Sequence, residues 1–246
     1  MGGIGGGLLD TFASLKIINP FDGQVCGEIA EADSTRVREL CAAARAEFSS
    51  WRRTPLEERR ALVRRGVDWF RANKERVARD ITLQMGKPIA QARNEVDGLC
   101  QRAEHMLAIA ADALATQTLP EEQGLTRRIE HEPLGVVLNL AAWNYPLLIA
   151  VNVVVPALLA GNVVLLKHSA KTPLCGQHFA EAFPHVHDLV MGHEQTAELI
   201  RSGRVDHVAF TGSVDGGRSV FRHVAEAPHF LDTGLELGGK DPAYVA

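Results

Sequence analysis

One glutamate in the sequence lies in surroundings that suit proton transfer. Glu236 stands between Leu235 and Leu237 and precedes the run Gly238-Gly239-Lys240-Asp241-Pro242. A carboxylate is most effective as a general base when its pKa lies near the operating pH, and burial among apolar groups raises a carboxyl pKa toward that range. We therefore predict that Glu236 is an active-site base, in preference to a glutamate of a surface loop.

A second segment has the pattern of a phosphate-binding turn. Residues 205–210 are typical of a strand, Gly212-Ser213 of a turn, and the residues after Ser213 of a helix. Glycine lets the backbone approach a pyrophosphate, and the free N–H groups of a first helical turn and a serine hydroxyl can donate to it. The same Gly-Ser pair is also an ordinary helix N-cap, so both interpretations are open at this point.

Two more polar segments follow predicted buried strands. Trp143-Asn144 comes after the apolar run 136–140, and Lys167-His168-Ser169-Ala170-Lys171 comes after the apolar run 163–166. Open parallel α/β sheets bind ligands outside the carboxyl ends of their strands, so we expect both segments at one binding edge.

Each of these two segments has a purely structural alternative. Asn144 can cap a helix that carries Pro146 in its first turn, although a cap can also be a donor to a ligand. Lys171 can face solvent at the start of the next helix.

Taken together, the four segments resemble motifs of the aldehyde dehydrogenase superfamily, and they occur in the family's order over roughly residues 16–246. The segment around Glu236 is similar to Glu-Leu-Gly-Gly-Lys, whose glutamate activates water to hydrolyse a thioester. The segment that starts at Phe210 is similar to the cofactor loop Phe-Thr-Gly-Ser-x-x-x-Gly, with Gly217 as its last glycine.

The family's Pro-Trp-Asn-x-Pro segment matches here, with Ala142 in place of the first proline. The resemblance implies that the Asn144 amide stabilises the oxyanion formed when a thiolate attacks an aldehyde. It also matches Lys167 to the family's Lys-Pro-x-Glu-x-Thr-Pro, where the lysine and the glutamate hold ribose hydroxyls. Ala170 replaces that glutamate, which removes one obstacle to NADP, and Lys171 could pair with its 2′-phosphate. The cofactor contacts implied are Trp143, Lys167, Ser169, Ala170, Gly212, Ser213, Gly217 and Leu237.

The resemblance implies NAD(P)-dependent oxidation of an aldehyde to a carboxylic acid. In the family a cysteine nucleophile follows the glutamate by a few tens of residues, whereas only ten residues follow Glu236 here and none is cysteine. We expect a truncated chain that holds the NAD or NADP site but lacks the catalytic domain and is inactive alone. The alternatives are a non-catalytic cofactor-binding module, pseudoenzyme or scaffold, and one half of a split enzyme. Expected partners are a small aldehyde and either a second copy, a full-length relative or the missing half.

Strands that alternate with helices predict an α/β fold, with a Rossmann-like parallel sheet and crossover helices over about 127–246. A helical region over about 33–115 and a short β arm over 15–32 precede it, within one domain of residues 15–246. Within the helical region we expect a capping box at Thr54, one helix to Met85 and another over 88–115. The segment 1–14 is predicted to be a disordered tail, despite its glycines.

Composition excludes several classes of function. A formal charge of −4 leaves no basic surface for nucleic acid, and four widely separated cysteines favour a reducing, cytoplasmic location without disulfides. His185 and His187 do not make a metal site by spacing alone. The uncharged stretch 147–166 is interpreted as a buried helix, a Gly-Asn turn and a strand rather than a membrane span. The connection 183–188 is shorter than in the family, and we expect strain there.

Overall fold

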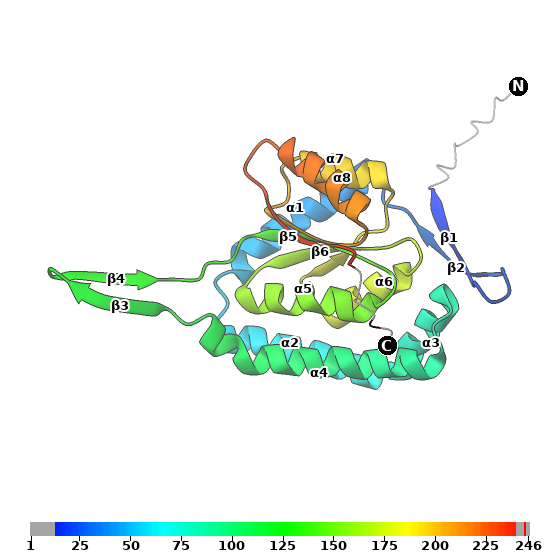
Figure 1. The fold of residues 1–246 in the computed structure, drawn as a ribbon, viewed down its shortest axis with the longest axis horizontal. Coiled ribbons are helices and arrows are strands. Elements are labelled where there is room, and N and C mark those ends of the chain that lie inside the picture. Colours follow the sequence, from blue (N-terminus) through cyan, green and yellow to red (C-terminus); the bar gives the residue numbers. More distant parts are fainter. Residues whose placement is uncertain (1–12, 240–243, 245–246) are drawn as a thin grey trace, which may run out of the picture.

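The computed structural model describes residues 13–239 and residue 244. At its centre is a parallel sheet of five strands in the order β7-β6-β5-β8-β9 (Figure 1). The strands are β5 (Val136–Ala141), β6 (Val163–His168), β7 (Val186–Asp188), β8 (His207–Thr211) and β9 (Asp232–Glu236). The predicted Rossmann-like sheet is therefore confirmed.

The sheet has one hydrophobic core on each face, because successive side chains of a strand point to opposite sides. Val137 and Val164 belong to one core, and their neighbours Val136 and Val163 belong to the other. All six residues of β5 are buried, which is why this strand reads as a continuous apolar run instead of an alternating one.

Helices cover both faces of the sheet (Figure 1). One face packs against α1 (Ser34–Trp51), α7 (His193–Arg201) and α8 (Val214–Ala225). The other packs against α5 (Pro146–Ala160) and α6 (Pro173–Ala182), with α2 (Leu56–Ala72), α3 (Lys74–Met85) and α4 (Ile89–Ala113) outside them. This order confirms the helical region that precedes the α/β part.

The uncharged stretch 147–166 folds as predicted. It forms most of α5, which ends at Ala160, and then enters β6 after Gly161 and Asn162. Gly161 takes the left-handed conformation (φ +92°) that ends the helix, and the Asn162 side chain accepts a hydrogen bond from the Gly135 backbone N–H (2.9 Å). In the part of the chain that the structure describes, no helix is both long and apolar enough to cross a membrane.

The prediction of one helix from the Thr54 segment to Met85 is wrong. Asn73 separates α2 from α3, and its side-chain amide donates to the Trp69 carbonyl (2.9 Å). An asparagine side chain that competes for a backbone carbonyl favours a break of this kind. The predicted capping box is also wrong, because Pro55 is the N-cap residue and no side chain caps α2.

The strand β7 lies at Val186–Asp188, although the run Asp188–Met191 is the segment whose residue types are typical of a strand. Val186 to Asp188 pair with β6, and beyond them the Val190 carbonyl accepts from the Ala32 N–H (2.7 Å) instead of continuing the ladder. The short connection before β7 carries no left-handed residue. The ring of Phe183 is fully buried against Gly66, where a Cβ would lie 2.1 Å from it. The Gly66 position thus makes room for the Phe183 ring of this connection.

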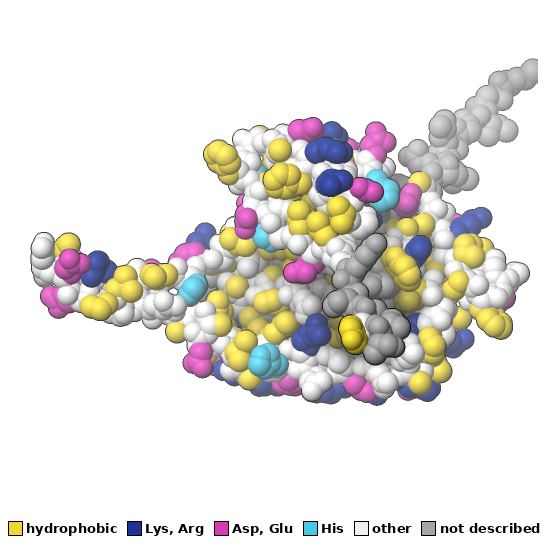
Figure 2. Space-filling model, viewed as in Figure 1, with side chains coloured by type: hydrophobic (Ala, Val, Ile, Leu, Met, Phe, Trp, Pro, Cys, Tyr) yellow, Lys and Arg dark blue, Asp and Glu magenta, His cyan; other side chains and the backbone are white. Residues whose placement is uncertain are grey.

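Two hairpins lie outside the main body. The predicted arm is confirmed as the antiparallel pair β1 (Ser14–Ile18) and β2 (Val25–Ala30), and the expected tail lies outside the described residues except at its last two positions. The second hairpin, β3 (Gln117–Glu122) and β4 (Leu125–Ile129), was not predicted. It extends from the body with exposed apolar side chains (Figures 1 and 2). With no buried face, its strands carry no alternating pattern that periodicity could detect.

Candidate functional site

A cavity of about 620 Å³ lies at the carboxyl ends of β5, β6, β7 and β8. The chain order reverses here, because β5 has β6 on one side and β8 on the other. Both its place at a topological switch point and its volume are typical of a site for a nucleotide-sized ligand. Six of the predicted cofactor residues line it: Trp143, Lys167, Ser169, Ala170, Gly212 and Ser213.

The Gly-Ser turn is a helix N-cap that keeps a hydrogen-bond donor free. Ser213 is the N-cap of α8, and its Oγ accepts from the Gly216 backbone N–H (3.1 Å), which leaves the hydroxyl proton free to donate. The ring of Phe210 lies beneath the turn, where a Cβ at Gly212 or at Gly216 would come within 2.5 or 2.7 Å of it. Glycine is therefore required at both positions for close packing of the turn.

Two lysines, Lys167 and Lys171, line the cavity. Burial lowers the pKa of Lys167, and the charge of Glu31 partly offsets that effect. Lys171 is exposed, as its structural alternative requires, but its Nζ also lies 4.4 Å from the centre of the Trp143 ring. Ala170 adds no carboxylate, so the carboxyl groups that line the cavity come from Glu31 and Asp188.

Glu31 lines the cavity but is not among the site residues predicted from the sequence. It follows β2, and every other wall residue except Leu15 lies more than a hundred residues further along the chain, so no local pattern links Glu31 to them. Only the packing of the N-terminal arm beside β7 brings it there, through the hydrogen bond between Ala32 N–H and the Val190 carbonyl.

The two predicted catalytic residues lie at the same edge but outside the cavity wall. Asn144 follows β5 and Glu236 ends β9, with β8 between those strands. The Asn144 side chain is exposed and caps nothing, because Tyr145 is the N-cap residue of α5 and makes no side-chain cap. The capping alternative for Asn144 is therefore wrong.

The chain by itself does not bury Glu236. Glu236 is exposed, because β9 is an edge strand whose residues alternate between half-buried and exposed positions. Its backbone carbonyl accepts from the Gly212 N–H (3.0 Å), and it pairs with Thr211 in the sheet. The end of β9 is thus joined to the Gly-Ser turn through the backbone.

Gly217 and Leu237 contact one another instead of lining the cavity. A Cβ at Gly217 would lie 2.4 Å from Cδ2 of Leu237. These two residues therefore hold α8 against the end of β9, and any contact they make with a cofactor lies outside the cavity described above.

The cysteines are poorly placed for nucleophilic chemistry. Cys41, Cys100 and Cys175 are buried, Cys26 is half-buried, and burial raises the pKa of all four thiols. A thiol with a raised pKa holds little of the reactive thiolate. Residues 13–239 and 244 also contain no group of three side chains suited to hold a metal ion.

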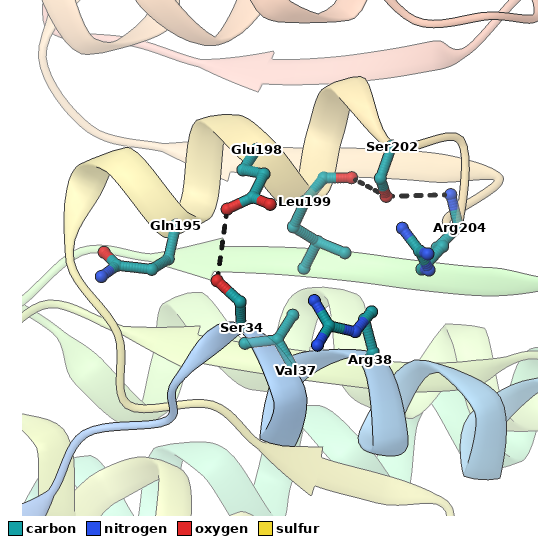
Figure 3. Close-up of a pocket in the computed structure, with 8 residues that line it drawn as sticks. All are labelled: Ser34, Val37, Arg38, Gln195, Glu198, Leu199, Ser202 and Arg204. Atoms are coloured by element: carbon teal, nitrogen blue, oxygen red, sulfur yellow. Dashed lines mark hydrogen bonds between the residues drawn. The ribbon is translucent and has the colours of Figure 1, made fainter. Parts of the chain in front are cut away.

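A second, smaller cavity of about 130 Å³ lies between α1 and α7 (Figure 3). Arg38 and Arg204 approach it from opposite sides, and Ser34 donates to Glu198 across it (3.4 Å). None of the predicted site residues lies there.

The model of the aldehyde dehydrogenase family matches residues 10–246. The chain belongs to the aldehyde dehydrogenase family. It is 37% identical over 234 residues to N-succinylglutamate 5-semialdehyde dehydrogenase 1 of Caulobacter vibrioides. The match covers 92% of this chain and 49% of that protein. It is 32% identical to 3,6-anhydro-alpha-L-galactose dehydrogenase of Streptomyces coelicolor, covering 96% of this chain and 49% of the relative.

Solved structures give the same result. The chain superposes with a TM-score of 0.85 on succinic semialdehyde dehydrogenase from Streptococcus pyogenes in complex with NADP+, at 26% identity, over 92% of this chain and 51% of that one. The TM-score is 0.84 for a betaine aldehyde dehydrogenase from Staphylococcus aureus in complex with NAD+, at 27% identity, over 92% and 48%. The chain thus spans about half the length of the relatives it matches, and the family assignment made from the motifs is confirmed.

Proposed function

We propose that these residues form the NAD(P)-binding part of an aldehyde dehydrogenase that oxidises an aldehyde to a carboxylic acid. The observation that carries the proposal is the 620 Å³ cavity, whose wall joins the strand–Gly-Ser–helix turn to Lys167 at the switch point of the sheet. Family membership and relatives that hold NADP+ or NAD+ support it. Four free cysteines fit a reducing compartment, and a cytoplasmic location is part of the proposal.

The residues present fit a dinucleotide. The first-turn amides of α8 and the Ser213 hydroxyl would bind the pyrophosphate, since a helix N-terminus favours negative charge. Lys167, whose Nζ makes only a long contact to the His168 carbonyl (3.4 Å), would bind a ribose hydroxyl. The bound cofactor supplies the acceptor for the hydride that leaves the substrate.

Two residues of this chain would act on the substrate. The Asn144 amide would donate to the oxygen that gains negative charge when a thiolate attacks the aldehyde. Glu236 would take a proton from the water that releases the acid. The four cysteines here are ill suited to supply the thiolate, so we propose that it comes from outside these 246 residues.

Titration calorimetry with NAD+ and NADP+ tests the cofactor site. We expect Ser213→Val to weaken both cofactors, because it removes the helix cap and one donor, while Arg38→Ala in the second cavity leaves both affinities unchanged. If the folded chain binds neither cofactor, or if the two variants behave alike, the cavity is not the cofactor site. A chain that binds a cofactor but stays inactive when joined to a thiolate-bearing relative would support the binding-module alternative.

A further inference from the structure

Lys87 lies in the short connection between α3 and α4. Gly86 ends α3 in the left-handed conformation (φ +76°), and Pro88 is the N-cap residue of α4. The side chain of Lys87 is only 7% exposed, which is rare for a lysine unless it is paired.

The ammonium group of Lys87 has three partners, and two of them belong to the segment that carries Asn144. Its Nζ forms an ion pair with the Glu95 carboxylate and donates to the Asn144 backbone carbonyl (2.9 Å). It also lies 4.0 Å from the centre of the Tyr145 ring. Because an ammonium group has three donors and no acceptor, these contacts satisfy it.

Glu95 binds the next residues along the same segment. Its side chain is 1% exposed, and Oε1 accepts from the backbone N–H groups of Leu147 (2.9 Å) and Leu148 (3.3 Å). These are first-turn donors of α5, a helix with no side-chain cap of its own and with a proline at its first position. A carboxylate at this end is also favoured by the helix dipole.

The pair therefore holds the backbone at two points that directly follow the Asn144 Cα: at the Asn144 carbonyl and at the start of α5. We propose that Lys87 and Glu95 are positioning residues that aim the Asn144 amide at the substrate oxygen, an inference that rests on the proposed function. A buried ion pair contributes little net stability, so a purely stabilising role would be met as well by apolar residues of similar volume.

Hydrogen exchange of the 246-residue chain tests the structural part. In Lys87→Met/Glu95→Leu we expect the backbone amides of Leu147 and Leu148 to exchange at least about tenfold faster, because the carboxylate that accepts from them is gone. The matched control is Lys74→Met/Asp97→Leu, which removes another ion pair between α3 and α4 that does not contact this segment. Unchanged exchange at Leu147 and Leu148 in the first variant, or an equal change in the control, would overturn the proposal.

A single conservative substitution tests the proposal if the double variant does not fold. Glu95→Gln keeps the side-chain shape and an acceptor oxygen but removes the counter-charge of Lys87. We expect faster exchange at Leu147 and Leu148 with the rest of α5 unchanged. Exchange that stays at the level of the unmodified chain would again overturn the proposal.

Kinetics test the catalytic part, in residues 1–246 fused to the remaining portion of a relative. We expect Lys87→Met/Glu95→Leu to lower kcat on the order of 10–10²-fold without changing cofactor affinity, because a small displacement of a catalytic group is costly. In an Asn144→Ala background the same change should cost little more. Losses that multiply would overturn the positioning role. An inactive parent fusion would count against the proposed function alone, since the exchange measurement needs neither cofactor nor aldehyde.

Discussion

Gly217 of α8 and Leu237, the residue after β9, are in direct contact, and a Cβ at position 217 would lie 2.4 Å from Leu237 Cδ2. Because Gly217 has no side chain, the Leu237 side chain has room to pack against α8. Through this contact, and through the hydrogen bond from Gly212 N–H to the Glu236 carbonyl, the Gly-Ser turn and the predicted base are part of one packed unit.

This contact predicts a specific pattern of stability. Gly217→Ala should lower the free energy of unfolding by about 1–3 kcal/mol, because the new methyl group overlaps Leu237. In a Leu237→Ala background the same change should cost much less. Urea unfolding of the four chains measures both. Equal costs in the two backgrounds would show that the loss at position 217 does not come from the leucine.

Cofactor choice should depend on Lys171. With Ala170 in place of a carboxylate, we expect NADP+ to bind at least as well as NAD+. Lys171→Ala should weaken NADP+ by about tenfold, the effect of one charge-assisted hydrogen bond, and should weaken NAD+ less. Calorimetric titration of both cofactors decides this. A preference for NAD+ that persists in Lys171→Ala would refute it and would indicate that Glu31 takes the place of the missing carboxylate.

Two buried groups in the cavity wall make stability depend on pH in opposite directions. Burial raises the pKa of Asp188 to about 7, from an ordinary value of 3.8, despite a stabilising hydrogen bond from the Leu189 N–H. Burial also lowers the pKa of His168 to about 3, helped by the charges of Lys167 and His178. Between about pH 4 and 7 the native chain holds a proton on Asp188 that the unfolded chain has lost, so this group makes stability fall as pH rises.

For His168 the sign is reversed. Between about pH 3 and 6.5 the unfolded chain binds a proton on this imidazole that the native chain does not, so stability rises with pH. The two effects oppose each other from about pH 4 to 6.5. Asp188→Asn should therefore gain about 1.4 kcal/mol of stability relative to the parent for each pH unit from 4 to 7, and no more above pH 7. Urea unfolding across this range measures the difference, and a difference independent of pH would contradict it.

Asn144 and Glu236 should affect different steps of the reaction in the fused enzyme. Asn144→Ala should slow attack on the aldehyde on the order of 10²–10³-fold, because it removes a donor to the developing oxyanion. Glu236→Gln should leave cofactor binding intact and slow release of the acid, so that a burst of reduced cofactor precedes a slow steady state. Rapid-mixing absorbance measurements separate the two. Normal turnover after Glu236→Gln would show that Glu236 is not the base.

Local patterns in the sequence predicted β5, β6, β8 and the residues of the Gly-Ser turn, but they placed β7 two residues late and did not predict β9. Buried parallel strands have apolar side chains on both faces, so the runs at 136–140 and 163–166 are recognisable alone. The turn at Gly212-Ser213 is recognisable because a helix cap and a phosphate site need the same small and hydroxylated residues. The order of four such motifs along the chain was enough to identify the family.

Tertiary structure decided what depends on contacts between distant segments. Glu31 enters the cavity only because the arm lies beside β7, and Lys87 and Glu95 meet Asn144 only because α3, α4 and α5 pack together. The exposure of Glu236 follows from its place on an edge strand. The free energy of such contacts depends on partners far away in the chain, so residue type and spacing alone cannot predict them.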